Sequence, residues 1–353
     1  MIFYILLIIL AIGLFIITYW LPKTDKAISI TLLVVMILIG GFRDGIGCDY
    51  NSYTNWYNTG IRDYDFEFGF LIIIKVFRLL KLNHEFLFFS FSFFTYLFAY
   101  LGINKYAQKS TLCLVLYFII PVLFLYSFTY IRQFLSVAIA FYAFSFLIEK
   151  KYWVYFLLML LGISIHYSCF IPFVVFFMIF KWSAFIKIRY LYILMIITFV
   201  ISQIGIIHFL SLLFKDSRYL YYFSNKFAVP VPLMKLIVLN TMGLFVLWYY
   251  EKIGFQLSQQ RCLVFIYISS IIFLNIFSES TELTRIYIYF RIFEILLFSE
   301  IIFYFLLNKK IWLTSLVFCV YIYPFFRAII IDGEKQMYER QKLIPYKSLL
   351  FKK

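Results

Sequence analysis

The sequence predicts an all-α polytopic integral membrane protein with about twelve transmembrane helices and one interfacial amphipathic helix. Three observations predict this fold. The 353-residue chain is 65% hydrophobic and 24% aromatic, only 14% of it is charged, and short lysine- and arginine-containing breaks separate its apolar runs. Soluble domains are nearer half apolar and a quarter charged. The composition therefore excludes a water-soluble fold.

The predicted spans follow the order of the apolar runs and end where charged residues interrupt them. The first run, 2–21, is uncharged and has no small-residue cleavage site before Pro22, so it predicts a retained helix and not a cleaved signal peptide. No soluble domain and no repeat of fixed period is evident, so we expect a single polytopic domain over 1–353. The spans lie near residues 2–21, 27–42, 85–103, 111–129, 131–149, 152–166, 168–181, 189–212, 233–251, 261–277, 284–307 and 311–331.

The segment 66–82 has a different pattern. Lys75, Arg78 and Lys81 recur every three residues and give one basic face to an otherwise apolar helix. Such a helix lies in the membrane interface and does not cross it.

The basic residues, which give the chain a net charge of +15, lie at helix ends. This placement indicates helix orientation and contact with lipid phosphates, so we expect membrane lipids and not nucleic acid as partners. Assigning the lysine-rich turns to the cytoplasm puts loops near 43–66 and 213–232, and the C-terminal tail 332–353, on the outer side. The cytoplasmic turns contain Lys23, Lys26, Lys105, Lys109, Lys150, Lys151, Lys181, Lys187, Arg189, Lys252, Arg261, Lys309 and Lys310.

Several familiar kinds of site are not predicted. The five cysteines are scattered singly, so they fit neither a disulfide framework nor a zinc site. The chain has no Walker A sequence and no GxGxxG after a strand, so we expect no nucleotide cofactor. Asp63 and Asp65 have the DxD spacing of metal-dependent glycosyltransferases, but that spacing often arises by chance. We therefore expect a metal-independent protein without a cofactor.

Under this topology, unusual polar residues collect on the outer face. A guanidinium is always charged and grips phosphate oxygens with a planar fork of donors. Any one such arginine can be a snorkelling anchor, but a set drawn from distant segments predicts a strongly anionic partner, such as the diphosphate of a lipid carrier. The candidate substrate-binding residues are Arg43, Tyr53, Arg132, Gln133, Arg285, Tyr287 and Arg291.

Two residues are candidates for the base that accepts a proton from a sugar hydroxyl, Asp49 and His166. His166 lies where two short helices meet, a position where a histidine can also be a satisfied cap. Tyr50, Tyr53 and Tyr57 share one helical face. That face fits either an interfacial aromatic belt or a surface for stacking sugars.

The ordered series of these motifs resembles the EpsG/Wzy family of bacterial polysaccharide polymerases. The series is Phe42-Arg43, Gly47-Cys-Asp49 with Tyr53, Glu67-Phe-Gly69-Phe70, Ile131-Arg132-Gln133, the His166 segment, Arg285-Ile-Tyr287-Ile-Tyr289-Phe290 and Ile344-Pro345-Tyr346. One departure is the bulky run Phe134-Leu135-Ser136-Val137-Ala138, where an alanine-rich run is usual.

The resemblance implies a glycosyltransferase in the bacterial cytoplasmic (inner) membrane, with its active site facing the periplasm or exterior. Its substrate would be an oligosaccharide repeat unit on undecaprenyl diphosphate, as in an O-antigen polymerase, and its partners would include a chain-length regulator and a flippase. Two alternatives stay open. A flippase for the same lipid-linked sugar predicts charges along a central cavity and pseudo-symmetric halves, and neither is evident. A membrane O-acyltransferase would use His166 as its base.

Overall fold

The computed structural model describes residues 1–60, 66–205, 229–254, 258–334 and 341–351. Every named element in these ranges is a helix, and the only β-type pairing among them is an isolated bridge between Arg43 and Ser348. This confirms the all-α polytopic fold. We expect a single domain over 1–353. Within it, the contacts between residues divide the chain into two compact units. Unit 1 is Met1–Phe170 with Phe298–Lys353, and unit 2 is Ile171–Leu297.

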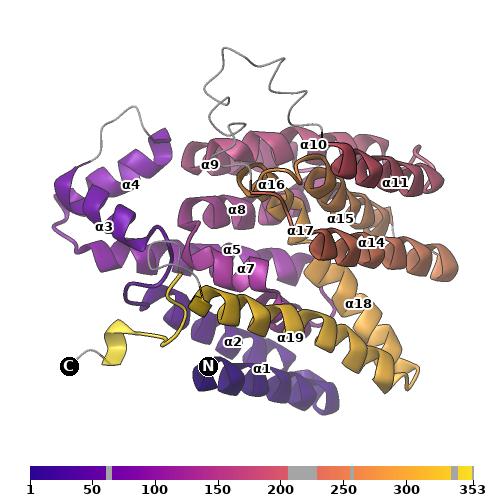
Figure 1. The fold of residues 1–353 in the computed structure, drawn as a ribbon, viewed down its shortest axis with the longest axis horizontal. Helices are drawn as coiled ribbons and strands as arrows, with labels where there is room; N and C mark the ends of the chain where they lie inside the picture. The colour runs from indigo at the N-terminus through magenta and orange to yellow at the C-terminus, as the bar shows by residue number, and fades with distance from the viewer. Residues whose placement is uncertain (61–65, 206–228, 255–257, 335–340, 352–353) are drawn as a thin grey trace. The chain divides into compact units, whose positions relative to one another are not determined.

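Unit 1 is a helix bundle built around α8 (Figure 1). Because α8 packs against both α5 and α9, 78% of it is buried, compared with 28% of the apolar stretches of α1 and α19. The apolar helices of unit 1 are α1 (Ile2–Trp20), α2 (Asp25–Gly41), α5 (His84–Tyr106), α6 (Ser110–Ile119), α8 (Ile131–Ile148), α9 (Tyr152–Ile165) and α19 (Ile311–Glu334).

Small residues allow α8 and α9 to approach closely. The Ser136 hydroxyl donates to the carbonyl of Gly162 at 3.0 Å. A Cβ added at Gly162 would lie 2.8 Å from the Cys169 sulfur, so a larger residue does not fit there. Close backbone contact and interhelical hydrogen bonds are what hold helices together in lipid, where apolar surface alone gives little preference.

The span predicted over 111–129 is bent. After α6, the chain turns by 83° into α7 (Pro121–Phe124) and the 3-10 turn η2 (Leu125–Phe128). Pro121 has no amide hydrogen and disfavours a helical conformation at Ile120, whose ψ is 107°. The helix therefore cannot continue straight.

Two short helices, α3 (Tyr50–Thr59) and α4 (Phe68–Leu79), lie at one end of unit 1. The 12 residues of α4 span about 18 Å, which is well short of the ~30 Å hydrocarbon core. Phe70, Leu71 and Ile74 are buried, whereas Lys75 and Arg78 are exposed. Both properties fit the predicted interfacial helix.

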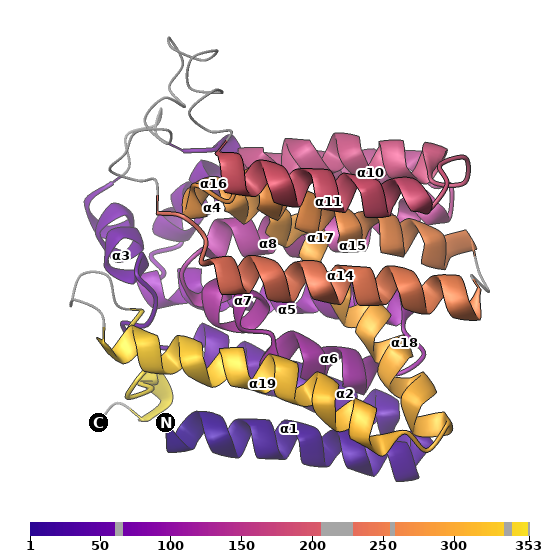
Figure 2. The same ribbon diagram turned by 45° about the vertical axis from the view of Figure 1, so that its right-hand side comes forward.

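Residues 341–349 form a strap, here called the C-terminal strap, across the loop 42–47 (Figure 2). Both Asp332 carboxylate oxygens accept backbone N–H groups at the start of the strap, from Gln341 and Leu343. The strap therefore joins the end of α19 to the loop that follows α2. Its bonds to the loop are Asp44 N–H to Lys347 O at 3.0 Å, Gly47 N–H to Gln341 O at 2.7 Å and Leu349 N–H to Phe42 O at 2.7 Å.

Lysine-rich turns lie at the other end of unit 1. Glu149 pairs with Lys105 at the end of α5 and with Lys151 before α9. Asp25 at the start of α2 accepts the backbone N–H groups of Ser110 and Thr111 at the start of α6. These contacts bring together several of the basic turns that the sequence predicts on one side.

Unit 2 is built around α15, which packs against α11, α14 and α17. A buried polar cluster links three of its helices, because Asn275 exchanges side-chain hydrogen bonds with Asn240 and also donates to Thr198 at 3.2 Å. Its helices are α10 (Phe170–Trp182), α11 (Arg189–Ile204), α14 (Leu233–Ile253), α15 (Ser258–Ile276), α16 (Thr281–Thr284), the 3-10 turn η4 (Arg285–Tyr287), α17 (Ile288–Arg291) and the start of α18 (Glu294–Leu307).

Fewer helices than predicted are long enough to cross a membrane on their own. Among the described residues, seven helices pass by length and composition, or eight if the bent pair at Pro121 is one span. Three more apolar helices, 152–165, 167–182 and 189–204, are shorter. The single span predicted over 284–307 is instead the broken series α16, η4, α17 and α18, because tight turns interrupt it at 285–287 and 292–293. The chain is thus a multi-pass membrane protein with several short or broken helices.

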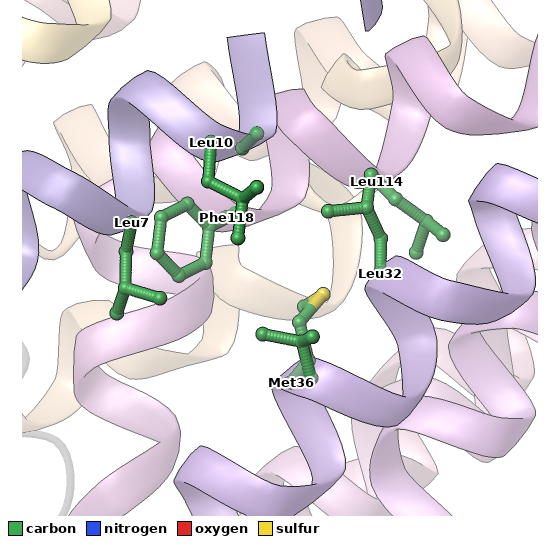
Figure 3. A pocket seen from close by; sticks show the side chains of 8 residues that line it. Leu7, Leu10, Leu32, Met36, Leu114 and Phe118 are labelled. Atoms are coloured by element: carbon green, nitrogen blue, oxygen red, sulfur yellow. The ribbon is translucent and has the colours of Figure 1, made fainter. Parts of the chain in front are cut away.

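A small apolar hollow lies between α1, α2 and α6 (Figure 3). Its labelled lining side chains, among them Leu10, Met36 and Phe118, carry only carbon and sulfur. The hollow offers no hydrogen bond to a polar headgroup. It is therefore not a candidate for the reacting end of a substrate.

Candidate active site

Two side chains and one backbone N–H from distant parts of unit 1 meet at the carboxylate of Glu67. Arg132 Nη1 donates to Oε2, and His166 Nδ1 donates to Oε1 at 2.8 Å. The backbone N–H of Tyr167 also donates to Oε1, at 3.3 Å. Glu67 is buried, with 7% of its side chain exposed, whereas Arg132 and His166 are 19% and 26% exposed. The cluster therefore has a buried anion and two partly accessible partners.

Local backbone structure places each member. Glu67 precedes α4 in an extended conformation, so its carbonyl starts the helix by accepting the N–H of Leu71. Arg132 is the second residue of α8. His166 ends α9 in an extended conformation, with its N–H on the carbonyl of Gly162 at 3.0 Å. Each functional side chain is thus fixed at the end of a helix.

Gly69 explains how Glu67 reaches His166. A Cβ at Gly69 would lie 2.5 Å from the Ser164 hydroxyl and 2.8 Å from the Ser164 carbonyl oxygen. Only glycine therefore allows the first turn of α4 to pack on the end of α9. This contact gives a physical reason for the Glu67-Phe-Gly69-Phe70 motif.

Aromatic rings surround the Arg132 guanidinium. The central carbon of the guanidinium, Cζ, lies 4.7 Å from the ring centroid of Phe66, 5.0 Å from that of Phe70 and 5.9 Å from that of Tyr53. Arg132 Nε also donates to the Tyr53 hydroxyl at 3.1 Å. Cation–π contact and hydrogen bonds together hold the cation in place. Nη2 of Arg132 makes no hydrogen bond to the residues that the structure describes, so it is the edge that a ligand can reach.

The charges around Glu67 determine whether its carboxyl group is ionised. Burial alone would raise the pKa of Glu67, but the hydrogen bond from His166 and the charge of Arg132 lower it to about 2. Glu67 is therefore ionised at neutral pH and can only accept hydrogen bonds. The proton in the bond must then be on His166 Nδ1, so in the neutral tautomer the lone pair is on Nε2.

Arg43 is buried within the fold, with 0% exposure. Its guanidinium donates to the carbonyls of Gly40, Ile46 and Phe128 and lies over the rings of Phe88 and Phe128. Burial lowers its pKa to about 10, which still leaves it charged at neutral pH. Arg43 thus holds the loop 42–47 to η2, and its role in binding substrate stays a prediction.

Gly47 completes this loop. A Cβ there would lie 2.3 Å from the carbonyl oxygen of Phe128, and the φ angle of +110° also favours glycine. The Phe42-Arg43 and Gly47-Cys-Asp49 motifs are therefore accounted for by packing against η2.

The predicted tyrosine face points inward. Tyr50, Tyr53 and Tyr57 are each less than 7% exposed, and Tyr50 stacks on Phe88 at 4.1 Å. Burial raises the pKa of Tyr53. The face packs α3 on the bundle, so neither a surface belt nor an open sugar platform describes it.

Two other candidates in unit 1 flank the cluster. Asp49 is half-buried directly before α3, and its backbone carbonyl accepts the N–H of Tyr53. Gln133 is buried beside Arg132 in α8. Asp63, Asp65 and the tyrosines 219, 221 and 222 of the predicted outer loop lie outside the described residues.

The remaining candidates belong to unit 2. Arg285 pairs with Glu282, and Arg291 Nε donates to the fully buried Glu294 at 2.7 Å. Arg291 Nη1 also lies 3.5 Å from the Tyr287 hydroxyl. The sequence predicts these arginines as substrate ligands, and in the structure each also has a carboxylate partner. The i, i+3 spacing of both pairs along a helical path was the signal that could have found them.

Glu67 is the main site residue that sequence reasoning missed. It stands in a quoted motif, but nothing in its local sequence shows that it faces residues 65 and 99 positions away.

The motifs that converge in unit 1 are part of a longer match. The model of a family described as the EpsG family matches residues 26–348, which is nearly the whole chain. No curated protein and no solved structure matches the chain. The matched range includes Glu67, Arg132 and His166, together with the cation-bearing helices of unit 2. The chain belongs to the EpsG family.

Proposed function

We propose that this protein is a polysaccharide polymerase that joins undecaprenyl-diphosphate-linked oligosaccharide repeat units at the outer face of the cytoplasmic membrane. The observation that carries the proposal is the Arg132–Glu67–His166 cluster in a multi-pass member of the EpsG family. It combines a cation for a diphosphate with a base for a sugar hydroxyl, the two functions that glycosyl transfer from a lipid diphosphate needs.

Arg132 is the proposed cation. As the bond between the anomeric carbon and the diphosphate oxygen breaks, negative charge grows on the leaving group. Arg132 is held by Tyr53, Glu67 and the aromatic rings, so its Nη2 edge is pre-positioned to donate to that oxygen. A fixed cation supplies the charge that other glycosyltransferases take from a divalent metal, so we propose a metal-independent reaction.

His166 is the proposed base. Its Nε2 accepts the proton of the acceptor sugar hydroxyl while the oxygen attacks the anomeric carbon, and the diphosphate leaves on its lipid carrier. Glu67 stabilises the imidazolium that forms, because its ionised carboxylate already holds Nδ1–H. One displacement inverts the anomeric carbon. Asp49 remains the alternative base.

The setting supports lipid-linked substrates. The cluster lies where α4, a short helix with the basic residues Lys75 and Arg78 exposed, meets the ends of α8 and α9. An isoprenoid tail can enter lipid beside such an interfacial helix while its diphosphate reaches Arg132. A chain-length regulator and a flippase are the proposed protein partners.

The test is the surface polysaccharide of the source bacterium after deletion of this gene. We expect repeat units that reach the surface singly, without a ladder of longer chains. The wild-type gene should restore the ladder, whereas His166→Gln and Arg132→Gln should not, at equal protein level. A purified sample should extend lipid-linked repeat units in the presence of EDTA.

Other outcomes favour other functions. No repeat unit at the surface would instead indicate a flippase. A full ladder with unchanged spacing would overturn both and indicate an O-acyltransferase that decorates surface sugars.

A further inference from the structure

A second group of cations lies in unit 2, at the start of α14. The segment before this helix runs beside the end of α15, because Val231 N–H donates to Ser278 O at 2.7 Å and Thr281 N–H donates to Val229 O at 3.0 Å. These two bonds bring the first turn of α14 next to η4. Lys235 in that turn therefore faces Tyr287.

Lys235, Tyr287 and Arg291 form one contact group. The Lys235 ammonium lies 5.5 Å from the centroid of the Tyr287 ring. The Arg291 guanidinium donates to the Tyr287 hydroxyl at 3.5 Å and lies 5.7 Å from the ring centroid. Tyr287 is 3% exposed and Arg291 is 8% exposed, whereas Lys235 is half-buried. Two cations thus lie against one buried tyrosine.

The charges in this group do not cancel. Glu294 balances Arg291, and Glu282 balances Arg285. Glu279 lies beside Gly205 at the end of α11 and has contacts of its own. Among the described residues, no carboxylate is within salt-bridge distance of Lys235. A half-buried ammonium in an apolar helix, with no carboxylate partner among the described residues, is costly, and such residues mark binding sites for anions.

We propose that Lys235, Tyr287 and Arg291 bind phosphate oxygens, and that the ligand is the diphosphate of a lipid-linked sugar. The Lys235 ammonium carries three N–H donors. The Tyr287 hydroxyl accepts from Arg291, so its own O–H proton can donate to a phosphate oxygen.

The choice of a lipid diphosphate rests on the proposed function. Joining two lipid-linked units requires a polymerase to hold two carriers at once. Arg132 in unit 1 serves one diphosphate, and this group serves another. The same donors also fit the phosphate of a phospholipid headgroup, so the test must separate these two sources.

The experiment measures ligand binding by the full-length protein in nanodiscs of neutral phosphatidylcholine. Farnesyl diphosphate is titrated against wild type, Lys235→Met and Lys235→Arg. The matched control is Lys252→Met, which removes an exposed lysine from the last turn of the same helix. We expect the dissociation constant to rise about 10- to 100-fold in Lys235→Met, to recover in part in Lys235→Arg, and to stay unchanged in the control.

A second arm repeats the titration in nanodiscs that contain phosphatidylglycerol. If this lipid displaces farnesyl diphosphate at equal concentration, and only when Lys235 is present, the natural ligand is a phospholipid headgroup and the lipid-diphosphate assignment is overturned. Equal affinity of wild type and Lys235→Met for farnesyl diphosphate would overturn the site itself.

A parallel chain-extension assay separates this inference from the proposed function. If wild type extends chains and Lys235→Met does so with the same substrate dependence and affinity, the inference fails and the polymerase stands. If wild type extends no chains but Lys235→Met still loses affinity, the polymerase fails and the phosphate site stands.

Discussion

Glu67 and His166 are 99 residues apart in the chain, yet the Oε1 and Nδ1 atoms of their side chains are 2.8 Å apart. The hydrogen bond links the start of an interfacial helix, α4, to the end of an apolar one, α9. Since Arg132 binds the other oxygen of the same carboxylate, one residue aligns both the proposed cation and the proposed base.

Removing the charge of Glu67 should therefore affect both the proposed cation, Arg132, and the proposed base, His166. Glu67→Gln cannot hold the imidazolium or the guanidinium as an anion does, so we expect about a 10²-fold slower chain extension. Glu67→Asp should recover part of the rate. Glu149→Gln is the control, because Glu149 is a partly exposed carboxylate between Lys105 and Lys151 at the other end of unit 1. Equal rates for Glu67→Gln and wild type would remove Glu67 from the mechanism.

Stability should depend on pH through the same carboxyl. Its pKa is lowered from 4.5 to about 2 in the folded protein. The contribution to stability is therefore complete above about pH 4.5 and is lost as the pH falls toward 2. It amounts to at most about 3 kcal/mol, and solvent around the partly exposed His166 reduces it. The melting temperatures of wild type and Glu67→Gln should converge between pH 6 and pH 3. A constant difference across that range would contradict this.

Gly69→Ala tests the approach of α4 to α9. The added methyl group meets the backbone of Ser164, so we expect a loss of about 1–3 kcal/mol in the free energy of unfolding and a lower rate as Glu67 moves away from His166. Gly13→Ala in α1 is the matched control. No atom outside its own helix lies within 4 Å of a Cβ at that position, so it should be neutral or slightly stabilising. Thermal unfolding in detergent measures the stability of both variants. Equal losses of stability in Gly69→Ala and Gly13→Ala would refute the packing argument.

Arg43→Lys should reduce the yield of folded protein. A lysine cannot serve the carbonyls of Gly40, Ile46 and Phe128 with one planar group. Leaving such buried acceptors unpaired costs about 1–3 kcal/mol each. Exposed Arg78→Lys should be harmless. Size-exclusion profiles after extraction measure the loss. If Arg43→Lys instead folds normally and fails only in chain extension, Arg43 belongs to the substrate site after all.

Deleting residues 341–353 should destabilise the loop 42–47, because the C-terminal strap supplies its backbone partners. We expect a lower melting temperature and slower chain extension. Lys347→Ala is the control, since the strap uses the backbone carbonyl of Lys347. Limited proteolysis should cut the deletion variant first near 42–47. An unchanged cleavage pattern would show that the loop holds without the strap.

The sequence was most informative about local pattern. The apolar runs predicted the helices, and the basic period of 66–82 predicted α4, because lipid and interface impose these patterns directly. Arg132 and His166 stood out because each is a polar residue at the end of an apolar helix. Glu67 was missed and the burial of Arg43 was not expected for the same reason, since a charged residue beside a membrane helix can turn either inward or outward. Only the packing of α3, α4 and α8 decides that direction.

The bend at Pro121 was also hidden within an apolar run. Its proline was visible, but apolar length alone favoured a straight span over 111–129. The carboxylate partners of Arg285 and Arg291 were likewise present in sequence at i, i+3 spacing.

The C-terminal strap also has a consequence for biosynthesis. Tyr346 donates to the carbonyl of Ile39, a residue that leaves the ribosome 307 positions earlier. The loop 42–47 therefore obtains its backbone partners only when the late part of the chain has been made. A nascent chain that stalls before residue 341 cannot finish this end of unit 1. Such a stalled product should be open to membrane proteases.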